Sequence, residues 1–202
     1  APPEVPSQRP SCHARGLTLV ELMVALSLLA ILAALAAPSF QSQLASSRLS
    51  ATTNEVLGSL TQARTLAIRL GTRVTMCRST SATDCDNTSG ATWSSGWIIF
   101  QDAVRSGTAA SVAAGDTVHF RQAAAPPDIS VQGSGNAADF VSFAADGQSK
   151  AMGGSIQPGK LRVCSRSRWL DDNSRARDLQ ISANGRIAVE QPHNMAASCP
   201  VS

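Results

Sequence analysis

Glu21 is the one charged residue in the apolar segment 17–37, which reads LTLVELMVALSLLAILAALAA. A carboxylate in a lipid-facing helix costs about 2.5 kcal/mol or more, so it needs a partner or a function. Gly16 stands directly before this segment and Pro38 directly after it. Glu21 is therefore the first residue whose type and position suggest a chemical role.

Four of the five cysteines follow the apolar segment: Cys77, Cys85, Cys164 and Cys199. The fifth, Cys12, precedes it. Basic residues stay on the cytoplasmic side of a membrane, which leaves Arg9 and Arg15 inside and the four later cysteines outside, where disulfides form. Four cysteines allow three pairings, and we favour the sequence-adjacent one, Cys77 with Cys85 and Cys164 with Cys199.

No pattern in the sequence indicates a metal, a cofactor or a catalytic centre. There is no C-x-x-C or G-x-S-x-G, and the histidines neighbour no recognisable nucleophile. The loop aspartates lack the spacing of a 12-residue calcium loop: they are Asp84, Asp86, Asp102, Asp171 and Asp172. We therefore expect no cofactor, no metal and no enzyme activity.

Seven basic residues stand against three aspartates between residues 160 and 186, a local balance of +4. They are Lys160, Arg162, Arg166, Arg168, Arg175, Arg177 and Arg186. Such clusters can contact DNA phosphates with a salt-dependent affinity. The alternative is a solvated hairpin face whose exposed ion pairs contribute little. The overall charge of +3 does not decide between the two.

One long helix over 17–70 is expected to carry Glu21. Its first 21 residues would extend about 31 Å, enough to cross the hydrocarbon core of a bilayer. Beyond Pro38, where we expect a kink or local loosening, the helix becomes amphipathic and ends before Gly71. Its apolar stripe is Leu49, Val56, Leu60, Ala63, Ala67 and Leu70. Gly58 should allow close packing at a cost of about 1 kcal/mol.

Beyond residue 72 the apolar pattern changes to a period of two, which predicts strands. We expect them at 73–77, 96–101, 117–122, 129–132, 140–144, 161–165, 178–182 and 186–190. Asn184-Gly185 predicts a hairpin between the last two. Leu179 and Ile181 should then share a buried face with Ile187 and Val189. Because only 4% of the residues are aromatic, Trp93 and Trp97 are expected in the core rather than at a ligand site.

These patterns predict an α+β fold with four segments. Residues 1–16 contain four prolines and form a leader, 17–37 the transmembrane half of the helix, and 38–70 its amphipathic half. Residues 71–202 form a β-rich head of one domain.

Gly16 and the segment after it resemble the class III signal and N-terminal helix of type IV pilins and of type II secretion pseudopilins. The head resembles the GspH/FimT branch of minor pilins. The residues that carry this second resemblance are the 77–85 cysteine loop, Trp93, 96–102 (GWIIFQD), 143–147 (FAADG), 161–164 (LRVC) and 179–186 (LQISANGR).

The resemblance implies a type IV pilin-like fold and a role in assembly. A prepilin peptidase would cut between Gly16 and Leu17 and methylate the new amine of Leu17. Glu21 would compensate that charge on its own or a neighbouring subunit. The implied partners are other pilins or pseudopilins, an assembly platform and the bacterial inner membrane, with the head in the periplasm and the subunit at a filament tip or in initiation.

Three alternatives remain open from the sequence. Some FimT-like pilins bind DNA through a Gly-Arg-x-Arg motif, which here reads Gly185-Arg186-Ile187-Ala188, with alanine at the second arginine. The apolar segment could instead be a secretory signal peptide cut before Ala37. It could also be a general single-pass anchor, with Glu21 tolerated near the membrane interface.

Overall fold

The computed structural model describes residues 18–103 and 109–200. The chain divides into two compact units, Ala1–Phe40 and Gln41–Ser202. Gly16 and Leu17, the predicted cleavage pair, lie outside the described residues, and so does the predicted leader.

Helix α1 (Leu19–Leu70) is 52 residues long and belongs to both units. It continues as an α-helix through Pro38, where we expected a kink or local loosening. Proline removes one backbone hydrogen bond there without ending the helix. The helix ends at Gly71, whose φ of +63° is the left-handed conformation that glycine adopts readily.

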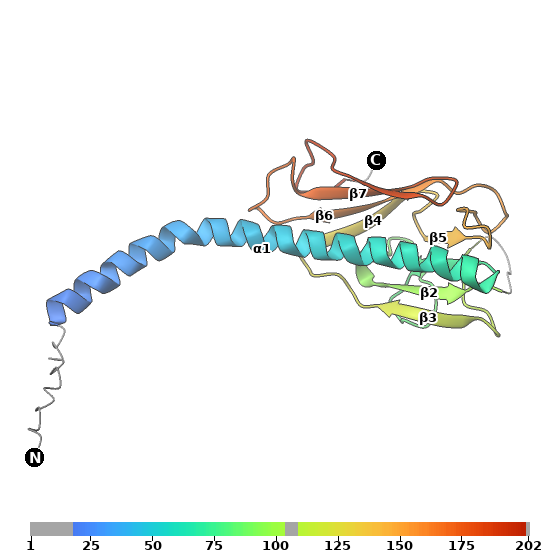
Figure 1. Ribbon diagram of the computed structural model, residues 1–202, viewed down its shortest axis with the longest axis horizontal. Coiled ribbons are helices and arrows are strands. Elements are labelled where there is room, and N and C mark those ends of the chain that lie inside the picture. The colour runs from blue at the N-terminus through green and yellow to red at the C-terminus, as the bar shows by residue number, and fades with distance from the viewer. Residues whose placement is uncertain (1–17, 104–108, 201–202) are drawn as a thin grey trace, which may run out of the picture. The chain divides into compact units, whose positions relative to one another are not determined.

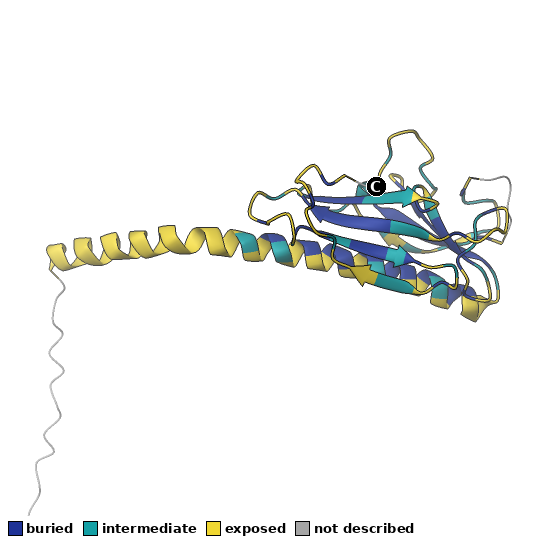
Figure 2. Ribbon diagram, turned by 90° about the horizontal axis from the view of Figure 1, so that it is seen from above, coloured by how far each residue is buried: buried dark blue, intermediate teal, exposed yellow. Residues whose placement is uncertain are grey.

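Residues 19–40 of α1 are exposed along their whole length (Figure 2). In the described part of the chain, α1 is the one helix long and apolar enough to cross a membrane, judged by length and composition. Continuous apolar exposure on every face of a helix requires lipid or other protein chains around it.

Residues 41–70 of α1 are amphipathic, as the spacing predicted. Leu49, Val56 and Leu60 are fully buried, as are Ala63 and Ala67 farther along the stripe. Leu70 was expected to complete the stripe but is 40% exposed, because it is the last helical residue before the turn at Gly71. Figure 2 shows the alternation of buried and exposed positions along this part of the helix.

Eight antiparallel strands form two four-stranded sheets in the second unit (Figure 1). The first has the order β3-β2-β1-β5: Thr117–Gln122, Trp97–Gln101, Val74–Arg78 and Phe140–Phe143. The second has the order β4-β6-β7-β8: Ile129–Gly135, Gly159–Ser165, Ala176–Ile181 and Ile187–Glu190. All eight predicted strands are confirmed, with ends shifted by a few residues. A 3-10 turn, η1 (Trp93–Ser95), precedes β2.

One hydrophobic core joins α1 to both sheets. Leu60 of α1, Met76 of β1 and Leu161 of β6 belong to the same buried cluster. Trp93 and Trp97 are also in this cluster and are each 1% exposed, which confirms their predicted place in the core. The burial of one helical face against two sheet faces stabilises the fold chiefly through the hydrophobic effect.

The β7–β8 hairpin forms at Asn184-Gly185, as predicted. Gly185 has a φ of +75°, and Leu179 pairs with Val189 across the hairpin. Leu179 and Ile181 are buried and Ile187 is half-buried, but Val189 is 44% exposed. The expected burial of Val189 is wrong, because β8 is the edge strand and has no neighbour beyond it.

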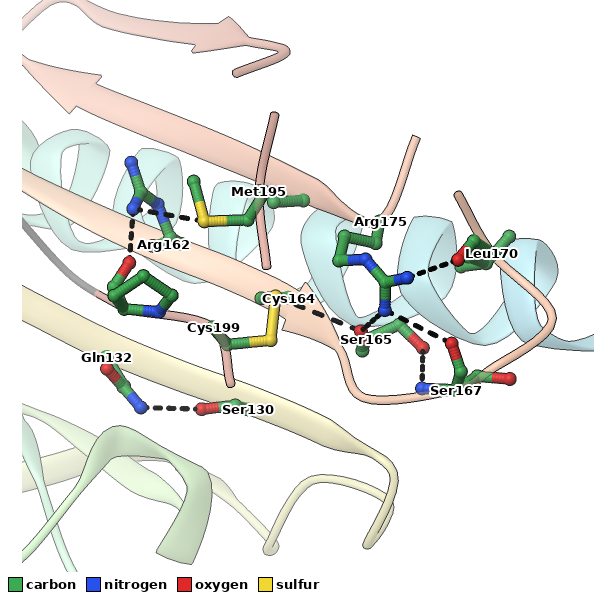
Figure 3. Close-up of a disulfide and its surroundings, with 12 residues drawn as sticks. Ser130, Gln132, Arg162, Cys164, Ser165, Ser167, Leu170, Arg175, Met195 and Cys199 are labelled. Atoms are coloured by element: carbon green, nitrogen blue, oxygen red, sulfur yellow. Dashed lines mark hydrogen bonds between the residues drawn. A yellow bond between two sulfur atoms is a disulfide. The ribbon is translucent and has the colours of Figure 1, made fainter. Parts of the chain in front are cut away.

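Both disulfides have the sequence-adjacent pairing. Cys77–Cys85 closes the loop after β1, with the Cα atoms 5.6 Å apart. Cys164–Cys199 fastens the C-terminal segment to β6, with a Cα separation of 5.9 Å (Figure 3). The two bonds therefore stabilise different parts of the head.

Candidate assembly and basic surfaces

Glu21 lies in the first turn of α1, and its side chain is exposed. Thr18 caps this turn: its hydroxyl oxygen accepts a hydrogen bond from the backbone N–H of Glu21 at 3.2 Å. The unpaired N–H groups of a helix start favour a negative charge. Glu21 therefore lies at the end of the helix where a negative charge is favoured.

The apolar surface around Glu21 is large. Its exposed side chains include Leu19, Val20, Leu22, Met23, Val24, Leu26, Leu28, Leu29, Ile31, Leu32, Leu35 and Phe40. Soluble monomers rarely expose a continuous apolar patch of more than a few hundred Å². This surface can therefore bind lipid chains or the apolar helices of other proteins.

The basic stretch between 160 and 186 does not form one patch. Arg166 and Arg168 follow β6 and lie in the β6–β7 loop, whereas Arg186 lies in the β7–β8 turn at the other end of β7. The six residues of β7 separate these ends by about 20 Å. Arg166, Arg168 and Arg186 are exposed, and Arg168 stacks on Trp169 with its guanidinium carbon 4.7 Å from the ring centroid.

Arg162 is buried and ion-paired, which removes it from any accessible DNA-binding surface. Its Nε and Nη2 atoms donate to the two carboxylate oxygens of Asp178, each at 2.6 Å. Its Nη1 donates to the Pro200 carbonyl and contacts the Met195 sulfur (Figure 3). Hydrogen bonding to Asp178 raises the pKa of the Arg162 guanidinium. The proposal of Arg162 as a DNA contact is therefore wrong: its register on β6 places it beneath the C-terminal segment.

Arg175 is likewise wrong as a DNA contact, because it is 5% exposed and organises the β6–β7 loop. It donates to the carbonyl oxygens of Ser165, Ser167 and Leu170 (Figure 3). It also pairs with the Asp172 carboxylate at 2.9 Å. These bonds engage all three nitrogens of the buried guanidinium and fix the loop.

Arg177, the second residue of β7, is half-buried and donates to two nearby carbonyl oxygens, that of Ser174 in the β6–β7 loop and that of Ala176. In the same loop, the pKa of Asp171 is lowered, chiefly by the backbone N–H of Asn173, which donates to its carboxylate. The loop is therefore held by local polar contacts. Arg166 and Arg168 remain its accessible cations.

Two arginines that the sequence did not single out join parts of the head that are far apart in the sequence. Arg64 of α1 donates to the carbonyl oxygens of Gly147 and Asn184, at 3.1 and 3.2 Å, and so ties the helix to two turns. Arg73 is buried before β1 and donates to the Ser142 hydroxyl at 2.8 Å. Neither has a local sequence signal, since their partners are about 70 or more residues away.

The described residues contain no group of three or more histidine, cysteine, aspartate or glutamate side chains that could hold a metal ion. The aspartates that the sequence placed in loops accept hydrogen bonds from protein groups, and one of them, Asp102, is buried and accepts from the Thr75 hydroxyl of β1. Asp86, for example, accepts from the Thr88 hydroxyl and the Thr80 hydroxyl, and the Thr88 contacts lower its pKa.

A long apolar helix that begins with a carboxylate in its first turn and continues into an antiparallel β head defines a pilin-like protein. A family model described as prokaryotic N-terminal methylation motif matches residues 12–37, and one described as type II transport protein GspH matches residues 52–185. The chain belongs to the GspH family, which is a family of pilins and pseudopilins.

Two solved structures are similar to this chain. The type IV minor pilin FimU of Pseudomonas aeruginosa shares 19% identity over 76% of this chain and 94% of its own, with a TM-score of 0.47. The minor pseudopilin EpsH of the type 2 secretion system of Vibrio cholerae shares 10% identity over 72% of this chain and 98% of its own, with a TM-score of 0.45. No curated protein matches the sequence.

Proposed function

We propose that this protein is a minor pilin or pseudopilin that helps to initiate or cap a short filament, either the pseudopilus of type II secretion or a type IV pilus. The observation that carries the proposal is the fully exposed apolar half of α1 with one carboxylate, Glu21, in its first turn. Such a surface is suited to lateral packing among similar helices, first in the membrane and then in a filament.

Processing would prepare the helix for assembly. A prepilin peptidase cuts between Gly16 and Leu17 and methylates the Leu17 amine, with the head in the periplasm. The cationic amine would stand four residues before Glu21 in the sequence, a spacing at which two charges on a helix can pair within a subunit or between neighbours. A carboxylate without a partner is costly in lipid, and this cost favours docking of the subunit in register at the assembly platform.

Replacement of Glu21 tests this mechanism in the native host. Glu21→Ala should leave cleavage and membrane insertion unchanged, since the apolar segment and Gly16 remain. Incorporation into filaments, measured by immunoblotting of sheared filament fractions, should fall by at least tenfold. Ser27→Ala is the matched control, because the Ser27 hydroxyl donates only within its own helix, to the Val24 carbonyl. Normal incorporation of the Glu21→Ala protein would contradict the mechanism.

DNA uptake is the second candidate function. The exposed Arg186 in the β7–β8 turn favours it, because it occupies the first arginine position of the Gly-Arg-x-Arg pattern. Full-length protein should then retard duplex DNA at low salt, and Arg186→Gln should weaken binding several-fold more than Arg177→Gln, whose side chain is occupied locally. An absence of binding at low salt would remove this candidate.

A further inference from the structure

A shallow, open groove follows the outward face of α1 in the head, where residues of the helix alone line it, and reaches Arg186 and Ile187 at the start of β8. Two adjoining cavities form it, with volumes of about 660 and 290 Å³, and both are lined by Leu57, Thr61 and Thr65. The first extends along α1 from Asn54 to Arg69. Residues 54–69 span about 22 Å of helix, which is the length of roughly four turns.

The floor of this groove is built for close contact with another backbone. Gly58 lies between Leu57 and Thr61, and a Cβ atom added to Gly58 would meet no heavy atom within 4 Å. We expected Gly58 to permit close packing, and it lies on the outward face of α1, where the open space would admit a partner. Ile68, which is 53% exposed, and Ile187 form an apolar wall beside this floor.

The charges around the groove all have one sign. Arg64, Arg69 and Arg186 line it, and no carboxylate does. Within the described residues, none of these three arginines forms an ion pair with an acidic side chain; Arg64 donates to carbonyl oxygens only. The groove therefore combines an apolar floor with cations that a partner could neutralise.

We propose that this groove binds an acidic amphipathic helix of a partner protein. A helix laid along the groove would place its apolar residues on Leu57, Thr61 and Ile68 and its flanking carboxylates beside Arg69 and Arg186. Complementary charge of this kind selects the partner and its orientation. Duplex DNA fits less well, because a phosphate backbone offers nothing for the apolar floor. The proposal concerns the head and is independent of Glu21.

The test uses the full-length protein in detergent micelles and two helical probe peptides of 18 residues. Each peptide carries leucine at helical spacing and a benzophenone group; glutamates flank the leucines in one and lysines in the other. The glutamate peptide should cross-link within residues 54–69 or 186–187, as mapped by mass spectrometry. Because the position of the cross-link is the readout, adsorption of peptide to the micelle does not count as binding.

Two variants and one control complete the test. The double change Arg69→Glu and Arg186→Glu should reduce this cross-linking at least tenfold and increase that of the lysine peptide. Gly58→Trp should block both peptides, since a Cβ atom at this position meets no heavy atom of the head within 4 Å and the indole would extend into the groove. Arg166→Glu, at the far end of β7, is the control and should leave the cross-linking of both peptides unchanged. Equal cross-linking of the two peptides, or cross-linking only outside the groove, would overturn the proposal. It would also be overturned if duplex DNA bound the groove and the glutamate peptide did not.

Discussion

Trp97 on β2 donates its indole N–H to the hydroxyl of Ser59 on α1 at 2.9 Å, and the two residues are 1% and 3% exposed. This hydrogen bond joins the helix to the first sheet inside the hydrophobic core. Helix and strand come from distant parts of the chain, so the contact reports directly whether α1 is docked on the head.

Ser59→Ala should therefore destabilise the head. The indole N–H of Trp97 would be left buried without an acceptor, at a cost of about 1–3 kcal/mol. The free energy of unfolding, measured in urea by tryptophan fluorescence, gives this value. Ser50→Ala, at an exposed position of the same helix, should change stability by less than about 0.5 kcal/mol. A loss no larger than that of the control would contradict the assignment.

Loss of Arg162 should be among the most damaging single changes in the second sheet. Arg162→Ala leaves the buried Asp178 carboxylate without its bidentate partner, and we expect a loss of about 3–5 kcal/mol. The pair Arg162→Met with Asp178→Leu should recover most of that loss in the same unfolding measurement. Arg166→Ala, at an exposed residue, is the control. If the double change were as unstable as Arg162→Ala, the buried charge would not be the cause.

The two disulfides should contribute unequally. Their sequence separations of 8 and 35 residues predict, from chain entropy, about 2.5 kcal/mol for Cys77–Cys85 and about 4 kcal/mol for Cys164–Cys199. Serine replacement of each pair, followed by thermal unfolding, should lower the midpoint more for the second pair. The reverse order would show that loop entropy does not govern their effect.

Alanine should have opposite effects at two glycines. Gly58→Ala should stabilise the protein by about 0.5–1 kcal/mol, because the helix gains propensity and the added methyl meets nothing. Gly185→Ala should destabilise it by more than about 1 kcal/mol, since its φ is +75° and the new Cβ would collide with the Gly147 carbonyl oxygen. Denaturant titration of both variants measures the change in the free energy of unfolding. Two changes in the same direction would contradict the structure.

The fold could be predicted from the sequence because its main signals are local. The stripe from Leu49 to Ala67 has helical spacing, the strands are short apolar or alternating runs between loops, and Asn184-Gly185 specifies its hairpin. The errors arise at the ends and edges of elements, where a periodic pattern does not show which residues lack a covering neighbour. Val189 is exposed because β8 is an edge strand, and Leu70 because the helix ends there.

For the basic stretch between 160 and 186, the sequence likewise could not predict which side chains are buried. Its composition gives a positive charge but not the accessibility of each cation. Arg162 is buried because β6 pairs with β7 in a register that sets it opposite Asp178, and because the Cys164–Cys199 bond holds the C-terminal segment over it. Arg186, from the same stretch, lies at the groove beside α1. Only the three-dimensional arrangement separates the structural arginines from the accessible ones.

The central claim is that the chain is a processed pilin-like subunit, and the N-terminal sequence and mass of the protein purified from its own membrane test it most directly. The account predicts a mature chain that starts at Leu17 and carries one methyl group on its α-amine, with Glu21 as the fifth residue. A chain that starts at Ala37, or one that retains Gly16 and the residues before it, would contradict the account.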